Sequence, residues 1–393
     1  MKRRIIKEVK GITLVALVVT IIVLLILSGV AISLSLGDGG IFKRAKEGAK
    51  TYQNASLNEK IELDEVSNYI EDYLNGRKEE TVITNVKEAI EKGTVYKENT
   101  VIYDEYNNPV KVPAGFKLAK DSGTDVTKGV VIEDVEAGND DTIGNQYVWI
   151  PVGDVYINTN KDTKRINLGR YEFETNSDGV MKQSADNYTE VIEIDVNQEW
   201  TYRELTSGVE NAIAKDLGDF ITKTKNASGY YIGRFEAGKV NENTNTFNIK
   251  KNQEVYNNIT QENAADLARN LYINNDFQSD LINSYAYDTA IIYIQAFSGD
   301  SDYSKQIRFQ DSLVTTGNAH DEENNYDVRC NIYDMAGSVR EWSTETSSAI
   351  GFARVFRGGG YESQTGRYTS SRYGNNDMEA AEDYIGFRSI LYV

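Results

Sequence analysis

One cysteine and one histidine, Cys330 and His320, set the first limits on the chemistry of this chain. A single cysteine cannot form a disulfide bond within the chain. Histidine supplies most metal-bound imidazoles and most general bases near neutral pH, so nearly every such mechanism would have to use His320. Zinc and iron sites that need several histidines are excluded within one chain. His320 lies in a polar stretch typical of a solvated loop, and no G-x-S-x-G sequence accompanies it, so we do not expect catalysis there.

The stretch from Tyr361 to Tyr384 has the composition of a recognition surface. Tyrosine contributes a large contact area at low entropic cost, and serine, asparagine and glycine supply adaptable hydrogen bonds, as in antibody binding loops. Arginines within the stretch could pair with anionic groups. An ordinary polar loop in a chain with 26 tyrosines is the alternative. The predicted ligand-binding residues are Tyr361, Arg367, Tyr368, Ser370, Arg372, Tyr373, Asn375, Asn376 and Asp377.

The charge of the chain argues against a nucleic-acid partner. Its 393 residues carry a net charge of -18, and 40% are hydrophobic, which is enough for a substantial core. Binding to nucleic acid depends on lysine and arginine that neutralise phosphates. Residues 1–11 hold five basic residues and one glutamate, so a small basic head precedes a strongly acidic body.

An uncharged segment from Ile12 to Leu36 predicts a membrane-spanning helix. Its 25 residues would extend about 37 Å at about 1.5 Å per residue, enough to cross a bilayer core of about 30 Å. The basic residues before it should stay on the cytoplasmic side, which places the body outside the cell. The apolar region of a secretory signal is shorter, about 7 to 15 residues.

Helical patterns continue beyond this segment. Residues 41–74 are rich in helix formers and carry an apolar stripe that should pack on a neighbour or on the head, and Asn75-Gly76 should end the helix. Strands are expected at 101–103 and 110–112. Two further helices are predicted, over 260–272 and over 279–297.

Three motifs near the C-terminus resemble the core of the formylglycine-generating-enzyme and sulfatase-modifying-factor family, a variant of the C-type lectin fold. They are NIYDMAGSVREW at 331–342, RGGGY at 357–361 and GFR at 386–388. The family form has asparagine at the place of Ser338 and serine at the place of Gly360. Upstream, 147–152 and 230–236 look like the family's opening strands. The resemblance extends over roughly 101–393 and implies an α+β head with this fold.

The resemblance also bears on metal sites. The enzymes that gave the family its name use two copper-binding cysteines between the RGG and GFR elements, where this chain has none. A related branch uses iron held by three histidines, so neither copper nor iron is expected. The family's calcium loop maps its side-chain ligands onto Asp334 and Glu341 and its carbonyl ligands onto Gly337 and Val339, which suits Ca²⁺. Alternatively, Asp334 fixes a turn and Glu341 pairs with a buried arginine such as Arg357 or Arg388.

The junction at Gly11 and Ile12 resembles the leader of a type IV prepilin. The resemblance implies that a prepilin peptidase cuts after Gly11 and that Ile12 becomes the methylated amino terminus of the mature chain. The family usually has glutamate at the fifth mature position, where this chain has Ala16. A minor or tip pilin, or a pilin-like anchor, fits that difference. A plain signal-anchor helix is the alternative.

Together these patterns predict a single-pass protein of the bacterial cell membrane. Its parts are a leader at 1–11, a transmembrane helix at 12–36, a helical stalk and linker at 37–97, and an extracellular formylglycine-generating-enzyme-like head at 98–393. The head is expected to bind an extracellular glycan or protein ligand and is not expected to be an enzyme. The alternatives are an enzyme of the family with altered chemistry, a structural subunit of a pilus or pseudopilus, and a variable protein diversified by a retroelement.

Overall fold

A computed structural model describes residues 82–393 except 172, 176–180, 183–213, 216, 242–244, 274–275, 308–311, 321–322, 324, 348–352, 363–367 and 376–379. The predicted leader, membrane helix and stalk lie outside the described residues. Within the described part of the chain, no helix has the length and apolarity needed to cross a membrane.

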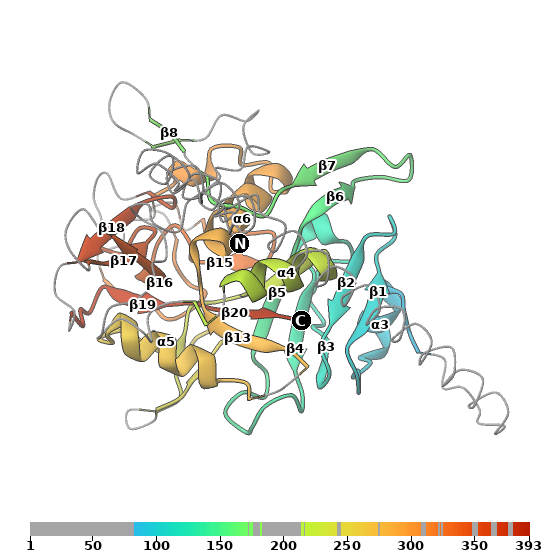
Figure 1. Ribbon diagram of the computed structural model, residues 1–393, viewed down its shortest axis with the longest axis horizontal. Coiled ribbons are helices and arrows are strands. Elements are labelled where there is room, and N and C mark those ends of the chain that lie inside the picture. Colours follow the sequence, from blue (N-terminus) through green and yellow to red (C-terminus); the bar gives the residue numbers. More distant parts are fainter. Residues whose placement is uncertain are drawn as a thin grey trace, which may run out of the picture. The chain divides into compact units, whose positions relative to one another are not determined.

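The described chain alternates short strands with four α-helices (Figure 1). The helices are α3 (Val86–Lys92), α4 (Leu217–Ala227), α5 (Gln261–Asn270) and α6 (Ser284–Phe297). The strands are β1 (Thr100–Tyr103), β2 (Pro109–Val112), β3 (Phe116–Leu118), β4 (Val131–Asp134), β5 (Gln146–Pro151), β6 (Gly153–Tyr156), β7 (Thr163–Ile166), β8 (Glu174–Thr175), β9 (Met181–Lys182), β10 (Gly229–Gly233), β11 (Gly238–Lys239), β12 (Phe247–Asn248), β13 (Gln278–Leu281), β14 (Val328–Arg329), β15 (Ile332–Tyr333), β16 (Arg340–Ser347), β17 (Ala353–Arg357), β18 (Arg372–Asn375), β19 (Ile385–Phe387) and β20 (Ser389–Tyr392).

The larger sheet is an antiparallel sheet of six strands in the order β13-β20-β10-β5-β4-β3. The last strand of the chain, β20, lies between β13 and β10, so the C-terminal residues form an inner strand of the sheet. Both predicted opening strands are confirmed as β5 and β10, although β10 ends at Gly233, and residues 147–151 pair with 229–233. Every residue of β10 is buried, which explains why its sequence does not alternate between polar and apolar.

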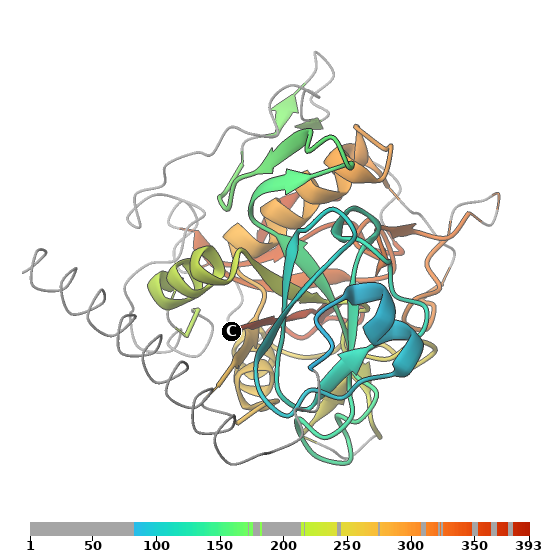
Figure 2. The same cartoon turned by 90° about the vertical axis from the view of Figure 1, so that its right-hand side faces the viewer.

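Different elements cover the two faces of this sheet. On one face the Tyr230 ring contacts Phe220 of α4, and its hydroxyl donates to the carbonyl of Ala286 in α6 at 2.5 Å. On the other face Tyr231 packs edge-on against Trp149, and its hydroxyl donates to the carbonyl of Lys111 in β2 at 3.1 Å. Figure 2 shows the β1–β2 hairpin and α3 turned toward the viewer. The predicted strands at 101–103 and 110–112 are confirmed as this hairpin.

A smaller sheet carries the three C-terminal motifs (Figure 1, red and orange strands). Its order is β18-β17-β16-β19, with β16 and β19 parallel and the other pairs antiparallel. The motif at 331–342 leads into β16, the RGG element ends β17, and the GFR element lies in β19 and the residue after it. Motifs that are far apart in the sequence therefore meet on neighbouring strands.

One predicted helix is confirmed and the other is corrected at its start. Helix α5 begins after Thr260, whose side chain accepts from the Asn263 amide, as the sequence pattern predicts. The helix predicted over 279–297 begins only at Ser284, because residues 278–281 form β13 and pair with β20. Asn283 is the N-cap of α6 and accepts from the Ala286 amide at 2.9 Å. Sheet pairing thus overrides the apolar helical period at this end.

The compact unit begins at Ile83, earlier than the predicted start of the head at residue 98. Helix α3 packs against β3, and Tyr103 donates its backbone N–H to the Thr84 carbonyl at 2.7 Å. Most residues of α3 are charged, but Val86 and Ala89 lie on one side of the helix and are buried.

Gly229 should be intolerant of a side chain. A Cβ atom there would meet the Trp149 ring and would lie 2.6 Å from the Ile150 carbonyl oxygen. We expect Gly229→Ala to lower the free energy of unfolding by about 1–3 kcal/mol, because the packed β5–β10 contact has to shift. Gly93→Asn is the control, since Gly93 has φ of +59° and no heavy atom lies within 4 Å of an added Cβ. Equal thermal stability of the two variants would contradict the predicted packing.

Candidate functional site

A buried network of ion pairs holds together the elements around the C-terminal motifs. Arg357 of β17 donates to Asp288 of α6 at 2.6 Å and to Glu345 of β16 at 3.1 Å. Arg372 of β18 donates to the same two carboxylates, at 2.9 Å for Glu345. Arg170 lies 3.7 Å from Glu345. Asp288 and Glu345 are almost fully buried, so each charge depends on the arginines around it.

The pKa shifts in this network follow from its charges. Burial acts to raise the pKa of Glu345, but Arg372, Arg357 and Arg170 outweigh it and lower that pKa to about 2. Burial opposes the charge of Arg357, whereas Asp288 and Glu345 raise the pKa of its guanidinium above the usual value. Burial lowers the pKa of Arg170 to about 10. Glu345, Arg357 and Arg170 are therefore charged at neutral pH.

The network changes the interpretation of the predicted recognition residues. Arg372 was expected to meet an anionic ligand, yet its side chain is 11% exposed and pairs with Asp288 and Glu345. Ser370 is buried, whereas Tyr361 and Tyr368 are partly exposed. Tyr373 is partly exposed and stacks on Phe356 with ring centroids 6.1 Å apart. Asn375 belongs to β18, and Arg367, Asn376 and Asp377 lie outside the described residues.

The part of this segment around Thr369 is tied to the chain that follows α6. The Thr369 amide donates to the Gln306 carbonyl at 3.1 Å, and the Ser370 amide donates to the Ser304 carbonyl at 2.9 Å. The Tyr287 hydroxyl of α6 donates to the Thr369 carbonyl at 3.1 Å. These bonds place the predicted recognition segment next to residues 303–306.

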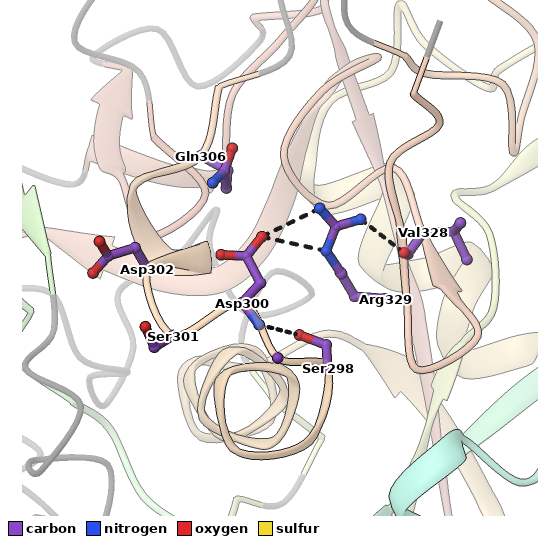
Figure 3. Close-up of a pocket in the computed structure, with 8 residues that line it drawn as sticks. Ser298, Asp300, Ser301, Asp302, Gln306, Val328 and Arg329 are labelled. Atoms are coloured by element: carbon purple, nitrogen blue, oxygen red, sulfur yellow. Dashed lines mark hydrogen bonds and ion pairs between the residues drawn. The ribbon is translucent and has the colours of Figure 1, made fainter.

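The chain that follows α6, together with Val328 and Arg329, lines an open pocket of about 710 Å³ (Figure 3). Helix α6 ends at Phe297 with Ser298 as its C-cap, and Gly299 takes up φ of +81°, which turns the chain into the acidic stretch that follows. Val328 is the only apolar side chain among the described residues that line the pocket. The lining residues are Ser298, Gly299, Asp300, Ser301, Asp302, Gln306, Val328 and Arg329.

The residues that line this pocket include two carboxylates and one guanidinium. Arg329 donates through two nitrogens to one carboxylate oxygen of Asp300, at 3.2 and 3.3 Å. The other oxygen of Asp300 points away from Arg329 (Figure 3). Asp302 pairs with Lys305 at 3.0 Å. Carboxylates, hydroxyl groups, an amide and a guanidinium thus line the pocket without a large excess of either charge, an arrangement that suits a polar, neutral ligand with several hydroxyl groups. The sequence analysis missed this pocket, because the 299–327 stretch reads only as a polar loop.

The residues of the predicted calcium loop have partners in the protein. Asp334 has φ of +64° and accepts from the amides of Gly317 and Ala319, so its carboxylate fixes a turn. Glu341 accepts from Arg388 at 2.6 and 2.8 Å. These contacts correspond to the alternative in which Glu341 pairs with a buried arginine. Gly337 and Val339, the predicted carbonyl ligands, lie in the buried turn between them. Calcium binding remains a prediction.

One unsatisfied oxygen in this loop is compatible with a cation. Glu341 keeps one carboxylate oxygen without a hydrogen-bond partner. Glu236, which follows β10, is fully buried, and burial together with the neighbouring Asp334 raises its pKa well above the usual value. No three histidine, cysteine, aspartate or glutamate side chains among the described residues form a ready-made metal site. The sequence analysis had placed Glu236 in a strand and had assigned it no role.

The structure also shows the surroundings of the single cysteine and the single histidine. Burial raises the pKa of the Cys330 thiol to about 12, so the thiol is protonated at neutral pH and is a poor nucleophile. His320 forms a β-bridge with Tyr326 and contacts its ring edge-on, with centroids 6.0 Å apart.

These elements define a mixed α and β domain in which the C-terminal motifs contribute Arg357, Arg388 and Glu341 to buried ion pairs. The chain belongs to the family described as the sulfatase-modifying factor enzyme 1-like domain, whose model matches residues 145–392. No curated protein matches the chain. The crystal structure of CarF is similar, at 19% identity over 30% of this chain and 48% of CarF, with a TM-score of 0.21. The match thus spans about half of CarF, and so low a TM-score carries no information about the site.

Replacing Arg357 should strongly destabilise the protein. We expect Arg357→Met to lower the free energy of unfolding by about 3–5 kcal/mol, because Asp288 and Glu345 would each lose a buried partner. Arg165→Met is the control, since Arg165 and Asp154 pair at the surface with side chains more than half exposed. Chemical denaturation would measure both. A loss for Arg357→Met as small as that for Arg165→Met would show that the network does not hold these elements together.

Proposed function

We propose that this chain is a surface-exposed recognition protein whose head binds a ligand without the copper-cysteine chemistry of the enzymes that gave the family its name. The observation that carries the proposal is the segment between the RGG and GFR elements. It contains no cysteine, and its described part is tied beside an open polar pocket. Family membership alone leaves the function open, because one fold hosts many functions.

The ligand that best fits the pocket is an extracellular glycan. Asp300, Ser301 and Gln306 offer hydrogen-bond acceptors and donors suited to sugar hydroxyl groups. Tyr361, Tyr368 and Tyr373 are partly exposed on the neighbouring segment and could extend the contact. A protein ligand is the other partner that the sequence analysis expected, and it would make more use of the tyrosines than of the pocket.

The head would be presented outside the cell by the N-terminal segments. In this proposal a prepilin peptidase cuts after Gly11, the mature chain begins at Ile12, and residues 12–36 anchor it in the bacterial membrane. The uncharged length of that segment and the basic residues before it support this arrangement. Association with pilus or pseudopilus subunits would follow from the same segment.

Glycan binding can be tested with the purified full-length protein. We expect binding in a glycan array, and we expect Asp300→Asn or Ser301→Ala to weaken it about tenfold, because each removes one hydrogen-bonding group from the pocket. Asp154→Asn, on the β6–β7 hairpin, is the matched control and should bind as the unchanged protein does. Tyr368→Ala tests the neighbouring segment. Arg372 is left unchanged, because it belongs to the buried network.

Either of two results would count against the pocket. One is a folded protein that binds no glycan. The other is binding that Tyr368→Ala weakens while the Asp300 and Ser301 variants bind normally, since this would move the contact to the tyrosines and favour a protein-like surface.

The N-terminal proposal has its own measurement. Mass spectrometry of the protein from its native membrane should find a mature chain that begins with N-methylated Ile12. Gly11→Leu should block cleavage, because it replaces the glycine after which the prepilin-like leader would be cut. If the protein of unchanged sequence still begins at Met1, the prepilin interpretation is wrong and the plain signal-anchor helix is the remaining interpretation.

A further inference from the structure

One buried side chain contacts both ends of the stretch from Tyr361 to Tyr384, here called the recognition segment. Arg340, the first residue of β16, is 7% exposed. Its guanidinium forms an ion pair with Glu362, near the start of the segment. The central carbon of the same guanidinium lies 4.8 Å from the ring centroid of Tyr384, the last residue of the segment. The two ends of the recognition segment therefore meet at one buried cation.

The main chain around Arg340 binds the same two ends. The Arg340 amide donates to the carbonyl of Tyr384 at 3.0 Å, and the Tyr361 amide donates to the carbonyl of Ser338 at 2.7 Å. Neither bond involves a side chain, so both can form with another residue at position 340. A substitution of Arg340 therefore tests its side chain and leaves the backbone bonds that close the segment.

Arg340 also belongs to a row of aromatic rings. Its central carbon lies 5.2 Å from the ring centroid of Phe356, and Phe356 stacks on Tyr373. The pairing of β17 with β18 places Phe356 opposite Tyr373. Phe356 is buried, whereas Tyr373 and Tyr384, the first and last rings of the row, are partly exposed. Attraction between the guanidinium and the ring faces on either side of it stabilises this arrangement.

The directions of the side chains at the two ends depend on Arg340. The Glu362 side chain is 30% exposed, so without its partner it would turn toward water. At the other end, the Asn257 side chain donates to the carbonyl of Asp383 at 2.6 Å. That bond fixes the path of the main chain, but it leaves the direction of the Tyr384 ring to Arg340. A ring that is held in place before a ligand arrives loses less conformational entropy when the ligand binds.

We propose that Arg340 is a positioning residue for ligand binding, which holds Glu362 and the Tyr384 ring in place at the base of the recognition segment. Tyr384 then contacts the ligand beside Tyr373, a role that the sequence analysis did not assign to it. Held tyrosine rings supply a large contact area at low entropic cost. The contact with a ligand rests on the proposed function, whereas the hold of Arg340 on the segment is a property of the fold alone.

The hold of Arg340 can be measured without a ligand, by hydrogen–deuterium exchange of the full-length protein. In Arg340→Met the backbone bonds remain but should open more often, so we expect severalfold faster exchange over 361–384 and unchanged exchange elsewhere. Arg340→Lys keeps a positive charge between Glu362 and the rings and should bring exchange to within about twofold of the unchanged protein. Arg269→Met is the matched control, because it removes another largely buried ion pair, with Asp280.

The role in binding is measured with the same variants on a glycan array. We expect Arg340→Met and Tyr384→Ala each to weaken binding about tenfold, because each removes the fixed Tyr384 ring from the contact. Arg340→Lys should bind nearly as the unchanged protein does. Arg269→Met should bind normally even where it lowers the melting temperature, which separates positioning from a general loss of stability.

Each failure identifies the step that is wrong. Unchanged exchange over 361–384 in folded Arg340→Met would overturn the hold of Arg340 on the segment. Faster exchange with normal glycan binding would overturn its role in binding, and normal binding by Tyr384→Ala would remove that ring from the contact. Faster exchange in a protein whose unchanged form binds no glycan would contradict the proposed function and not the hold. If Arg340→Met does not fold, Glu362→Gln decides, since it removes the same ion pair and should also speed exchange.

Discussion

The pairing of Arg357 with Asp288 and Glu345 is the constraint on which the C-terminal half of the structure depends. The three residues come from β17, α6 and β16, and Arg372 adds β18. An isolated buried charge would cost several kcal/mol, so each element must be present for the others to keep their places. The guanidinium of Arg357 also lies over the Tyr287 ring, with 4.2 Å between its central carbon and the ring centroid, which adds a cation–π contact from α6.

Arg388 is a second arginine that holds elements together, through its ion pair with Glu341 of β16. Arg388 joins Glu341 to the carbonyls of Gly233 and Tyr333, and it thereby links the larger sheet to the smaller one. Arg357 belongs to the RGG element and Arg388 to the GFR element. Both motifs therefore supply an arginine that neutralises buried carboxylates and holds the fold together.

The contrast between the two buried clusters is chemically informative. Around Asp288 and Glu345, three arginines face two carboxylates, and the pKa of Glu345 falls to about 2. Around Glu236 and Asp334, carboxylates outnumber arginines, and the pKa of Asp334 rises to about 7, mainly through burial. In the first cluster each carboxylate has arginine partners within the protein. In the second, burial and neighbouring carboxylates raise the pKa values of both Glu236 and Asp334.

By itself the sequence determined the family, the predicted hairpin at 101–112, helix α5, and the opening strands, because these features rest on motif spacing or on local residue patterns. It also shows a single histidine, His320, and no cysteine between the RGG and GFR elements. Only the tertiary structure decided that residues 278–281 join a sheet, since that depends on pairing with β20, more than a hundred residues away. It likewise decided that Arg372 points into a charge network, that Glu236 lies beside Asp334, and that the stretch after α6 forms a pocket. These are contacts between segments distant in sequence, and no local pattern of residues records which charges will be buried together.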